Sequence, residues 1–180
     1  MPLPIAVKSM SFAHSEPEDR LVLLVEGEAG ARLALMFTRR LTERLMNGLA
    51  GIIERSSVAA NHAPADMRGD VVLLEHQGAV LATSEPSGAG VLPGTQQSQA
   101  EAITGEVPAR LVTSVSVTVH PETFDVVMHD AETILARFQA NRTELHRILD
   151  VFGRQAKAAE WNLRTEASWL EPGQTRVVLN

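Results

Sequence analysis

Six histidines are the side chains in this chain best suited to acid–base or metal chemistry, and they are His14, His62, His76, His120, His129 and His146. No two of them have the H-E-x-x-H, H-x-H or H-x₃-H spacing that places two imidazoles on one metal ion. The nearest approach to a catalytic pair is Glu75 next to His76. Adjacent side chains point apart on a helix or a strand, so we interpret His76 as a partly buried histidine on an apolar stripe. The sequence therefore predicts no metal site and leaves Glu75 and His76 as site candidates.

Sequence motifs for nucleophilic catalysis and for nucleotide binding are missing from the chain. No serine lies in a G-x-S-x-G or S-x-x-K motif, and there is no cysteine, which removes thiolate nucleophiles, disulfides and cysteine-ligated metals. The segment Gly88-Ala89-Gly90 lacks the preceding strand and the lysine of a phosphate-binding loop. Acidic residues are scattered instead of grouped as in calcium or two-metal sites. We therefore expect neither catalytic residues nor a cofactor, which favours a protein that is not an enzyme.

Three arginines, Arg39, Arg40 and Arg44, gather at the start of a predicted helix. The N-terminus of a helix carries a partial positive charge, so cations are unfavourable there. This misplacement predicts an anion or an acidic partner near the three guanidinium groups. The favoured interpretation is instead that the long side chains cover a sheet edge with their stems and keep their charged ends in water.

The predicted secondary-structure elements occur in two similar successions. The first has strands at Ile5–Phe12, Arg20–Glu26 and Ala31–Phe37 before a helix from about Thr38. The second has strands at Arg110–His120, Thr123–Asp130 and Glu132–Gln139 before a helix from about Asn141, where Asn141 and Glu144 predict a capping box. Self-similarity of this kind predicts an internal repeat of two β-β-β-α halves.

Hydrophobic periodicity supports these elements and sets the fold class. Val115, Val117 and Val119 alternate with serine and threonine, as in a strand with one buried face, and Phe124, Val126 and Met128 alternate in the next strand. The first helix has an apolar stripe of Leu41, Leu45, Leu49 and Ile52, and the second has Leu145, Ile148, Leu149, Phe152, Ala156 and Ala159. Aspartate in place of Leu45 or Leu149, in the middle of these stripes, is predicted to unfold the protein. We expect an α+β fold with an antiparallel sheet and helices packed on one face.

The expected domain organisation is a single domain in three parts. Residues 1–56 form the first half, residues 57–109 a linker, and residues 110–180 the second half with a tail. Within the linker, residues 70–83 fit either a helix or a hairpin, and a helix is favoured because Asp70 and Glu75 are poor strand residues. The stretch 84–108 is rich in glycine, proline and glutamine and is predicted to be a mobile loop.

Composition restricts the location and the partners of this chain of 180 residues. Its net charge is −6 and its isoelectric point is near 5.5, which is unfavourable for binding duplex nucleic acid. No apolar run has the length of a membrane span, and the N-terminus has no apolar core of a signal peptide, so we expect a cytoplasmic protein without membrane contact. Lys8 and Lys157 are the only lysines among 16 basic residues, which indicates a GC-rich bacterial genome.

Taken together, these features favour a non-catalytic intracellular bacterial interaction protein, either a small subunit or an adaptor of a larger assembly. The expected partner is another protein or a second copy of the chain, and Trp161 and Trp169 are candidates for an exposed partner surface. One alternative is a single-stranded nucleic-acid-binding protein that uses the three arginines and the sheet face. Two meander-plus-helix halves resemble, at the level of fold alone, the Whirly-type single-strand binders. No sequence motif carries that resemblance, and aromatic side chains for base stacking are few. A second alternative is a small-molecule-binding enzyme centred on Glu75 and His76.

Overall fold

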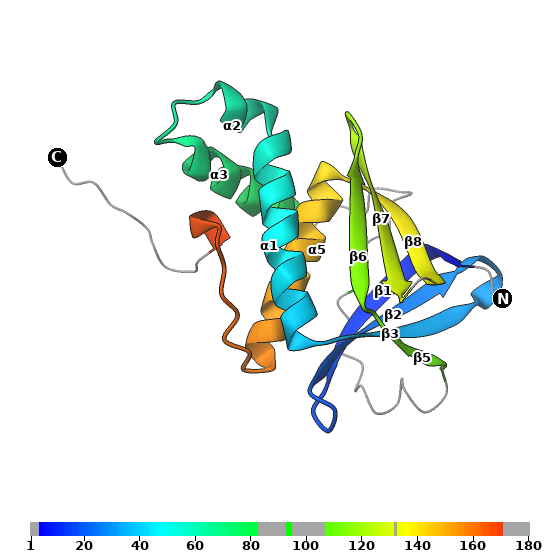
Figure 1. Ribbon diagram of the computed structural model, residues 1–180. Coiled ribbons are helices and arrows are strands. Elements are labelled where there is room, and N and C mark those ends of the chain that lie inside the picture. Colours follow the sequence, from blue (N-terminus) through cyan, green and yellow to red (C-terminus); the bar gives the residue numbers. More distant parts are fainter. Residues whose placement is uncertain (1–3, 83–92, 95–106, 132, 171–180) are drawn as a thin grey trace.

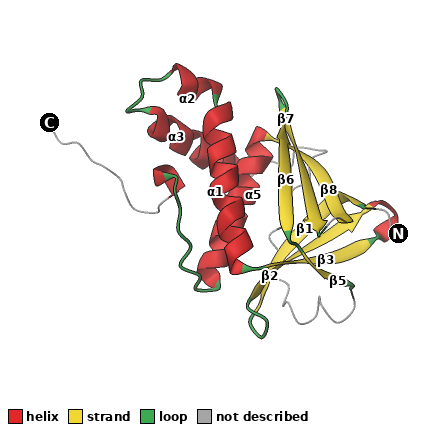
Figure 2. Cartoon of the chain, in the orientation of Figure 1, coloured by secondary structure: helices red, strands yellow, loops and turns green. Residues whose placement is uncertain are grey.

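The computed structural model describes residues 4–82, 93–94, 107–131 and 133–170, and it shows helices packed on one side of a mixed β-sheet (Figures 1 and 2). The strands are β1 (Ile5–Ser15), β2 (Arg20–Gly27), β3 (Arg32–Phe37), β4 (Pro93–Gly94), β5 (Ala109–Leu111), β6 (Ser114–Val119), β7 (Thr123–Asp130) and β8 (Thr133–Asn141). The helices are α1 (Arg39–Ser56), α2 (Val58–His62), α3 (Arg68–Leu81) and α5 (Arg142–Ala158), with short 3₁₀ turns η1 (Glu28–Gly30) and η3 (Ser168–Leu170). The α+β class expected from the sequence is confirmed.

Two antiparallel meanders make up most of the sheet. In the first, β2 pairs antiparallel with both β1 and β3, and in the second, β7 pairs antiparallel with both β6 and β8. Each meander runs directly into a helix, α1 after β3 and α5 after β8. The turn between β2 and β3 contains Gly30 at a φ of 76°, a conformation that glycine adopts without strain.

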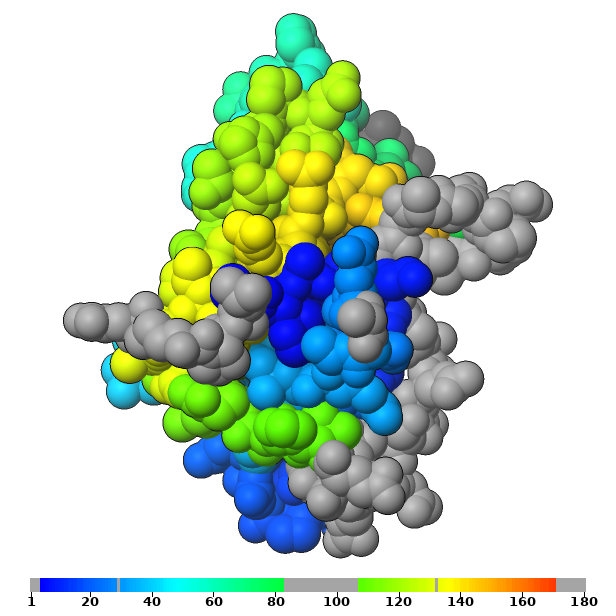
Figure 3. Space-filling model, turned by 90° about the vertical axis from the view of Figure 1, so that its right-hand side faces the viewer, coloured from blue at the N-terminus to red at the C-terminus, as the bar shows by residue number. Residues whose placement is uncertain are grey.

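The sheet as a whole is not antiparallel, which corrects the expectation from the sequence. The strand order is β5-β3-β2-β1-β8-β7-β6, and the pairs β1–β8 and β3–β5 are parallel, as is the pairing of β4 with β1. Figure 3 shows the two meanders meeting, with β8 (yellow) beside the start of β1 (dark blue). Parallel neighbours need a long crossover between them, and the segment between β3 and β5 provides one. Alternation in the sequence identifies strands but does not identify their neighbours.

The two long helices begin with side-chain caps and lie side by side over the sheet (Figure 1). The Thr38 hydroxyl accepts a hydrogen bond from the Leu41 amide at the start of α1. Asn141 and Glu144 form the predicted capping box of α5. The buried stripe of α1 is displaced by one position from the predicted stripe. Of the predicted residues, Leu41, Leu45 and Ile52 are only partly buried. The buried residues of α1 are Thr42, Met46, Leu49, Ala50 and Ile53.

The main hydrophobic core lies between the helices and the sheet and includes residues from both meanders. At its centre, the ring of Phe152 on α5 makes edge-to-face contacts with Phe12 on β1 and Phe37 on β3, at centroid distances of 5.0 and 5.3 Å. Leu149, one turn before Phe152, is fully buried. The position of α5 therefore depends on contacts with the first meander as well as with its own.

The region expected to be a linker contains two of the helices. Residues 58–62 form α2, and residues 68–81 form α3, so the helical alternative for this stretch is the one found. Asp70 lies in the first turn of α3 and does not cap it. Most of the predicted mobile loop, residues 84–108, lies outside the described residues. No helix within the described ranges is long and apolar enough to cross a membrane.

Candidate functional site

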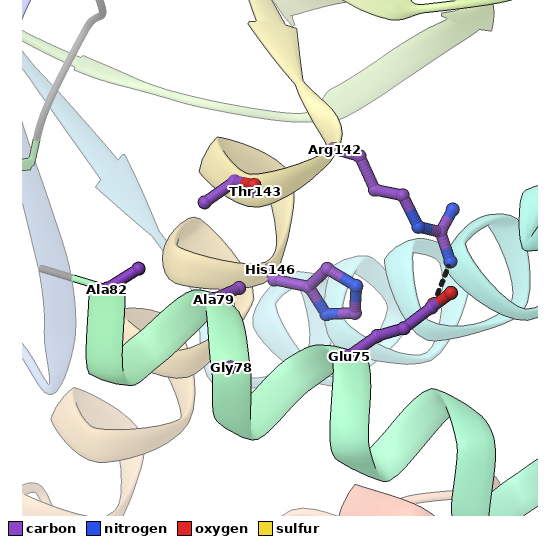
Figure 4. Close-up of a pocket in the computed structure, with 7 residues that line it drawn as sticks. All are labelled: Glu75, Gly78, Ala79, Ala82, Arg142, Thr143 and His146. Atoms are coloured by element: carbon purple, nitrogen blue, oxygen red, sulfur yellow. Dashed lines mark hydrogen bonds and ion pairs between the residues drawn. The ribbon is translucent and has the colours of Figure 1, made fainter. Parts of the chain in front are cut away.

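A cluster of polar side chains lies where α1, α3 and α5 meet, and it includes both Glu75 and His76. It borders a pocket with a volume of about 240 Å³ (Figure 4). The pocket is lined by Glu75, Gly78, Ala79 and Ala82 of α3 and by Arg142, Thr143 and His146 of α5. The sequence-based search found the α3 residues of this cluster but not Arg142 or His146. They are about 70 residues away in the chain, and no spacing rule connects them.

Glu75 and Arg142 form an ion pair that links three helices. Arg142 Nη2 lies 2.6 Å from Glu75 Oε2, and the other Glu75 oxygen accepts a hydrogen bond from the Ser57 hydroxyl at 2.8 Å. Arg142 also donates to the Ser56 hydroxyl and to the Ile53 carbonyl, both at 2.9 Å. The carbonyl groups at the C-terminus of α1 are partly negative, so a guanidinium there is favourable. Both oxygens of Glu75 are engaged, which favours a structural role for this carboxylate.

His76 and His146 contact each other directly beside the ion pair. Their Nδ1 atoms are 3.2 Å apart, so one imidazole donates a hydrogen bond to the other. The indole of Trp169 packs on both rings, at centroid distances of 5.3 Å from His76 and 6.2 Å from His146. The Nε2 atom of His146 is buried and has no hydrogen-bond partner among the described residues. The pair is therefore enclosed by three elements, α3, α5 and η3.

The surroundings of the two histidines keep both of them neutral near pH 7. Burial lowers the pKa of His76, and the carboxylate of Asp150 only partly opposes this effect. Burial, followed by the charges of His76 and Arg142, lowers the pKa of His146 to about 3. A general base works best when its pKa lies near the working pH, so His146 is a poor base at neutrality. In the part of the chain that is described, no three potential ligands gather around a metal position.

The three candidate arginines lie far from this cluster, at the opposite end of α1. Arg39, Arg40 and Arg44 are all exposed, and Arg39 donates a hydrogen bond to the Asn162 carbonyl at 3.0 Å. None of the three forms a salt bridge with an acidic side chain in the described ranges. The structure therefore does not combine the two sets of candidate residues into one site.

The expected exposure of the two tryptophans is wrong. Trp161 and Trp169 are each only 6% exposed. The indole N–H of Trp161 donates to Asp19, and that of Trp169 donates to Glu54 at 2.6 Å. Tryptophan in a polar tail suggests a surface role, but here the segment after α5 runs back along α1 and buries both rings (Figure 1).

An apolar surface that the sequence-based search missed lies on α3. Met67, Leu74 and Leu81 follow each other at intervals of seven residues and are 50%, 67% and 76% exposed. Val71 and Gly78 lie between them on the same side of the helix, and we call these five residues the α3 face. The opposite side of α3, with Val72, His76 and Ala79, packs on the rest of the protein. A helix that is apolar on all sides is normally buried on all sides.

Gly78 connects the α3 face with the pocket. It is one of the pocket-lining residues, and a Cβ atom at this position would meet no atom within 4 Å other than its chain neighbours and the nearby backbone of α3. The α3 face therefore has a notch at Gly78 that opens into the space between α3 and α5.

We found no match to this chain among models of protein families, among curated proteins or among solved structures.

Proposed function

We propose that this protein is a non-catalytic interaction protein, a small subunit or adaptor of a larger assembly, which binds an apolar helix of a protein partner on the α3 face. The observation that carries the proposal is the exposure of Met67, Leu74 and Leu81 on a helix whose other side is already buried. Exposed apolar surface that is contiguous marks interaction sites. In contrast, α1 and α5 each keep their apolar residues on the side facing the core.

The geometry of the α3 face favours a helix as the occupant. Its five residues are separated by alternating steps of four and three, the spacing of side chains that interlock between two packed helices. The notch at Gly78 supplies a hole for a side chain of the partner. An extended peptide would instead need the unpaired backbone groups of a sheet edge, which a helix face does not offer.

The polar cluster supports a non-catalytic role because its side chains mainly bind one another and the end of α1. Among the described residues, Arg142 Nε and His146 Nε2 are the two polar atoms of the cluster that are buried without a hydrogen-bond partner. Glu75 and Arg142 bind each other and the end of α1, and the two imidazoles hydrogen-bond to each other. We assign this cluster to the positioning of α3 against α1 and α5. The small-molecule-binding enzyme is therefore not our preferred function.

A photo-cross-linker in place of Gln77, which is exposed beside the α3 face, tests the proposal in cells of the native host. We expect a discrete protein adduct, identified by mass spectrometry of the joined peptides. The adduct should disappear when the same chain also carries Leu74→Glu. A cross-linker in place of Glu122, which is exposed in the turn between β6 and β7, is the matched control and should give no such adduct. If no adduct depends on Leu74, the α3 face is not a binding surface.

A second candidate function, binding of single-stranded nucleic acid, is favoured by one observation. Arg40 and Arg44 are exposed and have no acidic partner in the described residues. Three arginines release few counterions, and a net charge of −6 repels a polyanion, so we expect only weak binding at physiological salt. Fluorescence anisotropy with a labelled strand of about 30 nucleotides measures this affinity. Sub-micromolar binding that is lost in the Arg39, Arg40 and Arg44→Ala triple variant would make this the main function.

Two further proposals concern the internal repeat of the chain and the cellular location of the protein. We infer that β1-β2-β3-α1 and β6-β7-β8-α5 are copies of one ancestral unit, a proposal supported by their identical order and by the capped helix that follows each third strand. We also assign the protein to the bacterial cytoplasm, on the basis of its lack of cysteine and its strong preference for arginine over lysine.

A further inference from the structure

The partner helix, we infer, is α3 of a second copy of this chain, packed antiparallel so that Leu74 of each copy enters the Gly78 notch of the other. This inference rests on the proposed function, because it requires the α3 face to be a binding surface. It adds the identity of the partner and the geometry of the contact.

A two-fold axis that lies between the two copies of α3, at the level of residue 76, makes the α3 face complementary to itself. Residues whose numbers add up to 152 then lie opposite each other across the axis. Leu74, the largest exposed side chain near the axis, faces Gly78 of the second copy. Val71, which is partly buried against the core of its own chain, faces Leu81 of the second copy. In a parallel arrangement Gly78 would face Gly78 and leave a void, which forfeits packing energy. Two-fold symmetric dimers are also the commonest form of homo-oligomer.

The notch suits an apolar side chain such as that of Leu74. Its α3 wall consists of the small residues Gly78, Ala79 and Ala82 together with Glu75, which is paired with Arg142. The other side is formed by Arg142, Thr143 and His146 of α5 (Figure 4). Apart from the nearby backbone of α3 itself and the two chain neighbours of Gly78, no atom lies within 4 Å of a Cβ placed on Gly78, so the space above this residue is open to an entering side chain. The pocket volume of about 240 Å³ is small for a drug-sized ligand, whose sites typically occupy about 300–1,000 Å³.

Charges beside the α3 face do not oppose this pairing. Gln77, which is uncharged, borders the face near the axis on one side. Glu75 borders it on the other side, but Arg142 of its own chain holds that carboxylate at 2.6 Å. The repulsion that remains comes from the net charge of −6 on each copy, and salt screens it. Association should therefore strengthen as salt increases, whereas binding to a nucleic acid weakens.

The contact is small, because it involves one 14-residue helix from each copy. Interfaces at the low end of the size range are typical of transient complexes. We therefore expect a dissociation constant on the order of micromolar and a monomer–dimer equilibrium that depends on protein concentration.

Sedimentation velocity of the full chain from about 1 to 100 µM tests the inference, with dimer expected at the upper end. Leu74→Glu should weaken association by roughly 100-fold or more, because the altered side chain enters the interface twice. Gly78→Leu, which fills the notch, should weaken it by roughly 10-fold. Ile134→Glu is the matched control, since Ile134 is also a large apolar residue, 40% exposed, but lies on β8. Circular dichroism should show that all three variants remain folded, because none of the three positions is buried.

Engineered cysteines fix the direction of the helices, and the absence of native cysteine makes the result easy to interpret. Two copies of Gln77→Cys lie close to the axis and should join through a disulfide. Two copies of Asp70→Cys should not, because an antiparallel pair separates them by 12 residues, or about 18 Å. Efficient joining through residue 70 would overturn the antiparallel geometry.

The outcomes separate this inference from the function on which it rests. A wild-type chain that stays monomeric at 100 µM, together with a Leu74-dependent adduct to a different protein in cells, overturns the inference and leaves the proposed function standing. A monomeric chain with no Leu74-dependent adduct overturns both.

Discussion

Replacement of Leu149 by aspartate is expected to leave no folded protein. Leu149 is fully buried on α5, in the main core between the helices and the sheet. The substitution removes about 1.5–3 kcal/mol of apolar burial and places a carboxylate where it has no partner, which costs several kcal/mol more. The whole free energy of unfolding of a domain is only about 5–15 kcal/mol. Far-ultraviolet circular dichroism and thermal denaturation of the purified variant measure the loss.

Leu45→Asp provides a matched comparison on the other long helix. The sequence predicts the same outcome for Leu45 and Leu149, but Leu45 is only partly buried, because the buried side of α1 is displaced toward Met46 and Leu49. Its aspartate keeps some contact with water, so we now expect a lowered melting temperature instead of complete unfolding. A Leu149→Asp protein that melts no lower than the Leu45→Asp protein would show that α5 does not bury this side.

Acidification is expected to reduce stability steeply between about pH 6.5 and pH 3. Burial lowers the pKa of His146 to about 3 in the folded protein, whereas an unfolded histidine has a pKa near 6.5. Between these values the unfolded chain binds a proton that the folded chain does not bind. Stability is therefore full above pH 6.5 and falls as the pH decreases, by up to about 1.4 kcal/mol per pH unit for this group. The lowered pKa of His76 acts in the same direction.

Urea denaturation at a series of pH values measures this dependence. In the His146→Gln variant the free energy of unfolding should change much less between pH 6.5 and pH 4. His62→Gln is the matched control, because His62 is exposed and bonds only to a backbone carbonyl, and this variant should retain the wild-type slope. An unchanged slope in His146→Gln would show that His146 is protonated freely in the folded protein. Release of Trp169 from the two imidazoles should accompany the transition and appear as a change in tryptophan fluorescence.

The local signals in the sequence were sufficient for most of the secondary structure and for the α+β class. Alternation of Phe124, Val126 and Met128 identified β7, and all three side chains are buried. The pair Asn141 and Glu144 identified the start of α5 from residues three positions apart. Such features depend on neighbours within one turn or one strand, and a sequence records those neighbours directly.

The candidate site depended on contacts that no local pattern contains. His76 meets His146 across 70 residues, and Glu75 meets Arg142 across 67. The parallel pairing of β1 with β8 likewise joins Ile5 and Ala6 to Ala136 and Arg137, which are about 130 residues further along the chain. These contacts exist because both meanders and both long helices share one core, and the packing of that core decides which distant segments become neighbours.

The surface that we propose as the binding site also depends on contacts between distant parts of the chain. Trp161 and Trp169 are the residues that composition alone would place at a partner surface, yet the return of the chain along α1 buries both. Leu74 and Leu81 have no feature in the sequence that marks them as surface residues, yet they are among the most exposed apolar side chains. Local sequence patterns are enough to tell which residues are apolar and where helices and strands form. Which apolar side chains remain in contact with water depends on the packing of the whole fold, because a helix that is apolar on both sides buries just the side that the rest of the fold can cover.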